Sequence, residues 1–199
     1  MNRRTAFVTL VAALIFPGPA WGHLVTTGLG PFYDGISHLL VSPDDLVPVL
    51  ALALLAGVNG APVSRRMLCV LTVAWLAGGL AGTYLGGPAI PPAALSATFL
   101  VVGLLISLGC RLSPALITSI AAPVGILHGW LDGLAIAESR RDVLSLAGTV
   151  ATEFVIAAIV ASTALALTRG WVRIAVRVAG SWVAAIGLLM LGWSLHAVR

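Results

Sequence analysis

Residues 143–167 read VLSLAGTVATEFVIAAIVASTALAL, a stretch of 25 residues in which Glu153 is the only charged side chain. A helix needs about 20 consecutive apolar residues to cross the hydrocarbon core of a bilayer, so this stretch predicts a membrane-spanning helix. The rest of the 199-residue chain is similar: 59% of the residues are hydrophobic, 9% are charged and the mean hydropathy is +1.06. A soluble globular domain carries roughly 25% charged residues. The sequence therefore predicts an integral membrane protein.

Further apolar segments predict an all-α, polytopic membrane helix bundle with about six transmembrane helices. These are Leu46–Val58, Met67–Leu85, Ala93–Cys110, Pro114–Leu131, Val143–Leu167 and Ile174–His196. Because the first helix is short for a full span, we expect residues 30–41 to be half-buried against the bundle. Gly78, Gly79, Gly82 and Gly86 give the second helix a small-residue face that predicts close helix packing. Little chain is left over, which excludes a soluble catalytic domain and a nucleic-acid-binding module.

The N-terminus has the pattern of a secretory signal peptide. Arg3 and Arg4 precede an apolar core at residues 6–16, and the small residues Ala20 and Gly22 stand where a signal peptidase reads. The core is short for a membrane span, although an uncleaved first helix is the alternative. We therefore divide the chain into a signal peptide, residues 1–22, and a transmembrane domain, residues 23–199. The mature chain would begin at His23, whose amine and imidazole together could chelate a metal.

The positions of the arginines predict the orientation. Three of the loops between predicted helices carry arginine without an acidic residue: Arg65 and Arg66, then Arg111, then Arg169 and Arg173. Short arginine-bearing loops stay in the cytoplasm. The 132–142 loop mixes both charges, so we place it outside with the mature N-terminus. The predicted location is the inner membrane of a bacterium.

Ionisable residues inside or beside the apolar runs are candidates for function, since such groups are costly in a membrane. Asp34 and His38 are four residues apart, and so are His128 and Asp132, which places each pair on one helix face. Glu153 lies within a span, with Thr149 one turn before it. The predicted topology brings all three places to the outer half of the bilayer.

Imidazole and carboxylate ligands suit borderline divalent metals such as nickel, cobalt or zinc. Mixed nitrogen and oxygen ligands can also release an ion more easily than a closed thiolate cage, as transport requires. Structural alternatives exist for each group. Either histidine–aspartate pair could be a buried ion pair, and Glu153 could partner an arginine or be a protonated acid bonded to Thr149. Asp44 and Asp45 read as helix-start charges that could also form an acidic mouth for cations, and His196 reads as an interfacial residue.

Two stretches resemble a known family. His23-Leu-Val-Thr-Thr-Gly-Leu-Gly-Pro-Phe-Tyr-Asp34-Gly-Ile-Ser-His38-Leu-Leu and His128-Gly-Trp-Leu-Asp132-Gly look like the HupE/UreJ family, in its branch with a Gly-Pro-Phe-Tyr-Asp-Gly segment. The resemblance covers essentially the whole mature chain. By position, Asp34 and His38 match the acid and histidine of the family's first motif, and His128 matches the histidine of the later one. The better-known branch has His-x5-Asp-His instead, so the spacing differs here.

The resemblance implies a nickel, sometimes cobalt, permease or facilitator that supplies metalloenzyme maturation. The expected metal site is Asp34, His38 and His128, then Asp132 and Glu153, with His23 as an optional ligand on the way in. Ni²⁺ or Co²⁺ is then the transported ion, and we expect no tightly bound cofactor and no enzyme activity. The chain has no ATP-binding motif, so transport would be channel-like or ion-coupled.

Two other readings stay open. The first is a membrane accessory or assembly partner of a hydrogenase or urease system that transports nothing, in which the histidine–aspartate pairs are structural clamps. The second, weaker reading is an intramembrane hydrolase, because Ser37 and Ser42 lie near histidines without a recognisable nucleophile motif.

Overall fold

The structure, a computed structural model, describes residues 26–88, 90–140, 142–166 and 170–196. Within these ranges the chain is all helical, which confirms the predicted fold class. The helices are α2 (Pro31–Val41), α3 (Pro43–Asn59), α4 (Ala61–Leu85), α5 (Pro92–Leu108), α6 (Pro114–Glu138), α7 (Leu144–Ala166) and α8 (Gly170–His196). The predicted signal peptide and His23 lie outside the described residues.

Each of the six predicted helices is present, as α3 to α8, and several extend past their apolar run. The largest extension is that of α6, which was predicted to end at Leu131 and continues to Glu138. Residues 135–138, Ala-Ile-Ala-Glu, are mostly good helix formers and carry no proline or glycine to stop it. Asp132 therefore lies inside a helix rather than at its end.

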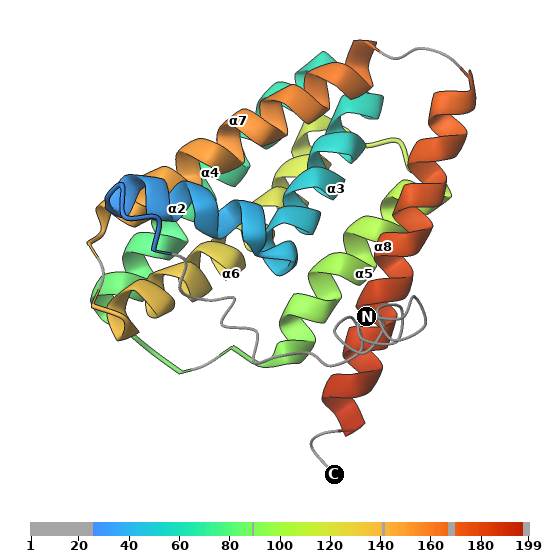
Figure 1. Ribbon diagram of the computed structural model, residues 1–199. Helices are drawn as coiled ribbons and strands as arrows, with labels where there is room; N and C mark the ends of the chain where they lie inside the picture. The colour runs from blue at the N-terminus through green and yellow to red at the C-terminus, as the bar shows by residue number, and fades with distance from the viewer. Residues whose placement is uncertain (1–25, 89, 141, 167–169, 197–199) are drawn as a thin grey trace, which may run out of the picture.

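Residues 30–41, which we expected to be half-buried, form the short helix α2. It ends at Val41 because Pro43 cannot continue a helix, and the new helix α3 starts there at an angle of 74°. Asp34, Gly35 and Leu39 are the buried residues of α2. In Figure 1, α2 lies beside the first half of α7, where Gly35 meets the backbone of Ser145.

Four helices, α4, α6, α7 and α8, are long and apolar enough to cross a membrane. The bent pair α2–α3 passes the same test as one broken span, which raises the number to five, while α5 is a shorter apolar helix of 17 residues. At the α2–α3 break Ser42 is buried, whereas its neighbours Val41 and Pro43 are exposed. The number of six crossings stays a prediction.

Glycines decide how closely the helices pack. A Cβ at Gly78 or Gly82 of α4 would overlap the backbone of α6, and one at Gly129 of α6 would overlap the Trp75 carbonyl of α4. The predicted close packing is confirmed for Gly78, Gly79 and Gly82, whereas Gly86 lies beyond the end of α4 at a φ of 60°. Helix α5 packs on α8 in the same way, and α3 lies between the two pairs (Figure 1).

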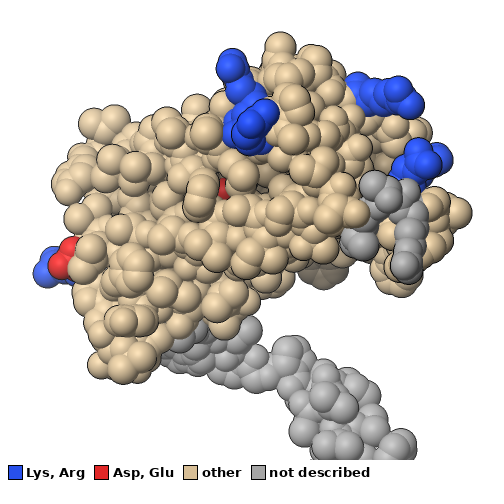
Figure 2. All heavy atoms as spheres, turned by 90° about the horizontal axis from the view of Figure 1, so that it is seen from above, with Lys and Arg blue, Asp and Glu red and all other residues tan. Residues whose placement is uncertain are grey.

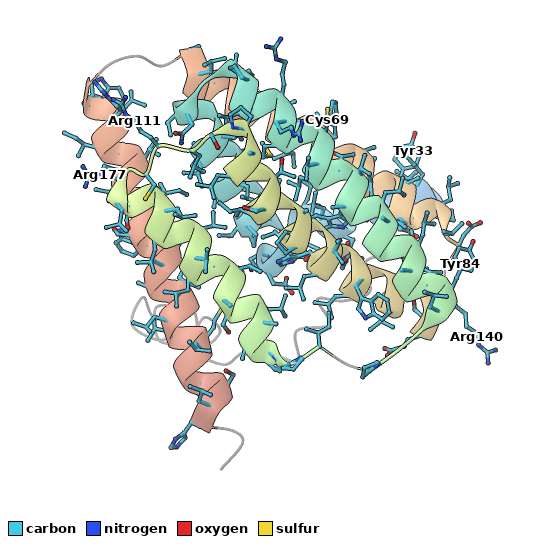
Figure 3. All side chains as sticks on the ribbon, turned by 180° about the vertical axis from the view of Figure 1, so that it is seen from behind. Tyr33, Cys69, Tyr84, Arg111, Arg140 and Arg177 are labelled. Atoms are coloured by element: carbon cyan, nitrogen blue, oxygen red, sulfur yellow. The ribbon has the colours of Figure 1, made fainter. Side chains whose placement is uncertain are left out.

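The surface is almost uncharged. Figure 2 shows a few basic and acidic residues on a face made mostly of uncharged residues. Arg111 and Arg177 lie at one end of the bundle, and Arg140 lies with Tyr84 at the other (Figure 3). The predicted orientation assigns these two ends to opposite sides of the membrane, and it stays a prediction.

Candidate metal centre

The break between α2 and α3 places two ionisable side chains in the interior. His38 is in the last turn of α2, and Asp45 is in the first turn of α3. The bend turns both toward the bundle, where His38 Nε2 lies 3.7 Å from Asp45 Oδ2. The backbone N–H of Ser42 donates to the carbonyl of His38 at 3.0 Å and closes the end of α2. The helix break is thus the feature that positions both groups.

The close packing of α4 on α6 supplies the third group. Because Gly125 and Gly129 have no side chain, Trp75 of α4 can approach α6, and its Nε1–H donates to Asp132 Oδ2 at 2.8 Å. The other oxygen of Asp132, Oδ1, lies 3.1 Å from His38 Nε2. Asp132 thereby joins α6 to both α4 and α2.

His38, Asp45 and Asp132 form a cluster that fits a divalent cation. One ligand atom from each residue lies within 4.8 Å of the other two. With metal–ligand bonds of about 2.1 Å, two ligands at right angles lie roughly 3.0 Å apart, so small side-chain shifts suffice to bind an ion. Asp45 and Asp132 are 6% and 5% exposed, whereas the His38 side chain is 17% exposed. We call these three residues the acid–histidine cluster.

His128 supports this cluster from behind. It is completely buried, its Nδ1–H donates to Asp45 Oδ1 at 2.8 Å, and its Nε2 lies 3.3 Å from Thr98 Oγ1. Its ring stacks on Trp75 with centroids 5.5 Å apart. A histidine that bonds to a ligating carboxylate fixes the orientation of that carboxylate. His128 therefore holds Asp45 in place through Nδ1, while its Nε2 lies near the Thr98 hydroxyl.

A small cavity leads to the cluster. Its volume is about 20 Å³, room for about one water molecule, and His38 and Asp132 form part of its wall. Ser139, Ser145 and Thr149 also line it, so its wall is partly polar. These residues lie near the end of α6 and the start of α7, at the end of the bundle that carries Arg140. The cavity thus gives the cluster a small, partly polar space at this end of the bundle.

Two residues predicted for the metal site lie elsewhere in the fold. Asp34 Oδ1 accepts hydrogen bonds from the backbone N–H of Thr27 at 2.6 Å and from its hydroxyl at 2.7 Å. Glu153 is completely buried and accepts a bond from the hydroxyl of Thr72 on α4 at 2.9 Å rather than from Thr149. Its Oε1 has no hydrogen-bond partner among the described residues. Neither carboxylate is part of the acid–histidine cluster.

The histidines pair with acids across helices rather than along one. Spacing along the chain suggested Asp34 with His38 and His128 with Asp132, whereas the bonds join His38 to Asp132 and His128 to Asp45. His196 is exposed at the end of α8, as expected of an interfacial residue. Helical spacing correctly put two groups on one face, but it could not show which neighbouring helix each face meets.

Asp45 is the functional candidate that the sequence analysis did not place in the site. The sequence analysis reads Asp44 and Asp45 as helix-start charges that could also form an acidic mouth for cations. A usable signal was present: successive helical residues point about 100° apart, so two adjacent acids at a helix start cannot both face the same way. One of them turns inward here, because the break at Ser42 sets the direction of α3.

The comparison with family models now identifies the chain's relatives. Residues 11–190 match the model described as HupE / UreJ protein. The chain belongs to the HupE / UreJ family. This confirms the resemblance noted in the sequence, over most of the chain's length. The comparisons with curated proteins and with solved structures find no match.

Members of this family are membrane permeases or accessory proteins. The family is associated with nickel or cobalt transport and with accessory roles in hydrogenase and urease systems. The several long apolar helices are consistent with a multi-pass membrane protein of this kind. Membership in the family thus indicates a general role in metal handling. The side chains of the acid–histidine cluster are of the kind that binds a divalent metal.

Proposed function

We propose that this protein is a permease or facilitator that moves nickel, or cobalt, across the inner membrane of a bacterium to supply metalloenzyme maturation. The observation that carries the proposal is the acid–histidine cluster, in which two buried carboxylates and one half-buried imidazole converge at a break in a helix. Ionisable groups in a membrane domain are costly and generally mark a path for ions. Broken helices in transporters also tend to lie at the ion site.

In this proposal the cation replaces a proton. A metal-binding imidazole nitrogen must be free of its proton, so the ion takes the place of the proton between His38 Nε2 and Asp132 Oδ1. Asp45 and Asp132 supply two negative charges that balance a divalent ion. His128 and Trp75 stay bonded to the outer oxygens of these carboxylates and keep them oriented. Nitrogen and oxygen ligands favour nickel, cobalt or zinc over calcium or magnesium.

The proposed path begins at the end of the bundle that bears Arg140, at the small cavity beside His38 and Asp132. In the predicted orientation this end faces the outside, with the mature N-terminus. His23 would be an additional ligand there, and Asp34 lies four residues before His38 on the same short helix.

Uptake of radiolabelled nickel into cells without their own nickel importers tests the proposal. We expect His38→Ala to reduce uptake to the background of empty cells while the membrane level of the protein is unchanged. His196→Ala is the matched control, because it removes an exposed histidine outside the cluster, and it should transport like the wild type. Normal uptake by His38→Ala would overturn the proposal.

A non-transporting accessory protein is the second candidate. It is favoured by the hydrogen bonds of the acid–histidine cluster, since His38–Asp132 and His128–Asp45 could serve only to clamp helices together. In that case His38→Ala should lower the membrane level of the protein, the wild type should give no uptake, and a metalloenzyme maturation protein should copurify with it.

A further inference from the structure

A large, partly polar cavity lies at the end of the bundle opposite the acid–histidine cluster. Its volume is about 630 Å³, and it lies between the end of α3, the α5–α6 loop and the first turns of α8. Three arginines line it: Arg111 from the loop, and Arg173 and Arg177 from α8. Figure 3 shows Arg111 and Arg177 together at this end. We call it the arginine cavity.

These arginines lack acidic partners. All ion pairs within the described part of the chain join a histidine to an aspartate, and no carboxylate lines the arginine cavity. Arg173 and Arg177 are four residues apart on one helix, a spacing at which like charges repel. The first turn of α8 contains no acidic residue, although a helix start favours negative charge. An anion in the cavity would offset both unfavourable arrangements.

The wall of the cavity is held in place by hydrogen bonds. Asn59 accepts a bond from the backbone N–H of Leu112 at 2.7 Å and donates to the carbonyl of Cys110 at 3.3 Å, on either side of Arg111. Arg177 donates from Nε to the Ser107 carbonyl at 2.8 Å, which leaves the outer nitrogens of its guanidinium for a ligand. The arginines are therefore carried on a fixed frame that joins three helices.

Apolar side chains surround the charged part of the cavity. Val58, Leu108 and Ile174 line it and are 41%, 67% and 65% exposed, and the neighbouring Trp171 on α8 is 62% exposed. A membrane helix with such residues on its outer face is covered by acyl chains. A ligand of this cavity must therefore pair with three arginine side chains and also cover the apolar surface beside them. An anionic phospholipid meets both requirements better than a free anion does.

We infer that the arginine cavity binds the phosphodiester headgroup of an anionic phospholipid, with the acyl chains against α5 and α8. Arginine matches the geometry of phosphate oxygens, and basic pockets between helices on the cytoplasmic side are suited to such headgroups. Arg111 is predicted to lie on this side. A bound lipid would link the α5–α8 pair to the end of α3. The inference does not depend on metal transport.

Native mass spectrometry of the full chain released from nanodiscs tests this inference. The nanodiscs contain equal parts of phosphatidylglycerol and phosphatidylcholine, and the measured quantity is the fraction of protein that retains each lipid. We expect the wild type to retain one phosphatidylglycerol in preference to phosphatidylcholine. Arg111→Gln/Arg173→Gln should weaken this retention about 25-fold, because each basic residue near an anionic lipid contributes about fivefold. Neither side chain makes a hydrogen bond to another described residue, so the fold should survive.

Two further variants control the experiment. Arg65→Gln removes an exposed arginine from α4, outside the cavity, and should leave retention unchanged. Arg111→Lys/Arg173→Lys keeps the charges that set the topology and should fall between the wild type and the glutamine variant. Equal retention of both lipids, or equal losses for Arg65→Gln and the cavity variant, would overturn the inference. So would displacement of the lipid by 10 mM inorganic phosphate, or an acidic protein that copurifies through these arginines in place of lipid.

Discussion

The acid–histidine cluster and the arginine cavity lie at opposite ends of the bundle. In the first, acidic side chains are paired with histidine, whereas in the second, basic side chains have no acidic partner among the described residues. In the cluster, the imidazole of His38 lies 3.1 Å from Asp132 and 3.7 Å from Asp45, so that two carboxylates from different helices share one histidine. In the cavity, Arg111, Arg173 and Arg177 line an open space without a carboxylate. Two carboxylates that share one imidazole in the interior can exchange a proton for a divalent cation, whereas arginines without a carboxylate at the surface favour an external anion. The two ends are therefore suited to ligands of opposite sign.

Disrupting the packing of α4 on α6, which positions Asp132 in the cluster, should have the largest effect. In Gly129→Val, the new side chain would overlap the Trp75 carbonyl, and the two helices must separate. We expect loss of the folded protein from the membrane, measured by immunoblot and by thermal unfolding in detergent. Gly192→Val is the matched control, since a Cβ there meets no atom within 4 Å. Equal membrane levels of the two variants would contradict the role of the glycine contact.

Asp132 should show the next largest effect. Asp132→Ala leaves both Trp75 Nε1 and His38 Nε2 without their partner in the interior, a change that costs about 3 kcal/mol of unfolding free energy. Thermal unfolding in detergent measures this loss. Arg140→Ala changes an exposed charged residue at the same end of the bundle, and its unfolding should match the wild type. A stable Asp132→Ala protein would show that the cluster does not hold the helices together.

Substitution of His128 shows whether this residue only orients a metal ligand or binds the metal itself. His128→Ala removes the hydrogen bond to Asp45 Oδ1 but leaves all three cluster residues in place. Loss of such a supporting bond lowers metal affinity about tenfold to a hundredfold. Nickel titration of the purified variant, followed by calorimetry, gives the change. Complete loss of binding would make His128 a ligand, and unchanged affinity would remove it from the site.

Glu153 should show the smallest effect. Its carboxyl is bonded to Thr72, lacks a cationic partner among the described residues and lies outside the cluster. Glu153→Gln preserves its shape, so we expect unfolding to change by less than about 1 kcal/mol and nickel affinity to stay the same. A large drop in nickel affinity, with normal folding, would instead return Glu153 to the metal site that the sequence predicted.

The fold was largely predictable because long apolar runs leave few alternatives. All six predicted helices exist, and the glycines at 78, 79 and 82 indicated a close helix contact. The end of α6 was placed seven residues early, since hydropathy marks where a membrane run ends and not where a helix does. Fewer than six helices are long enough to cross a membrane on their own, because α3 and α5 have only 17 residues each.

The site was predictable only in part. His38, His128 and Asp132 stood out because ionisable groups are rare in this chain. Asp45 did not, since an acid at a helix start has an ordinary explanation in the helix dipole. The pairing of His38 with Asp132 depends on a helix break and on glycine contacts between α4 and α6, and no local pattern reports which helices meet.

Nickel binding by two adjacent aspartate variants tests the central claim most directly. Asp44 and Asp45 are consecutive in α3, but only Asp45 belongs to the acid–histidine cluster. Purified wild type, Asp44→Asn and Asp45→Asn are titrated with nickel under identical conditions. We predict that Asp45→Asn loses at least about tenfold in affinity, because a charged ligand becomes neutral, whereas Asp44→Asn binds within about twofold of the wild type. Equal affinities for the two variants would contradict the assignment of the cluster as the metal site.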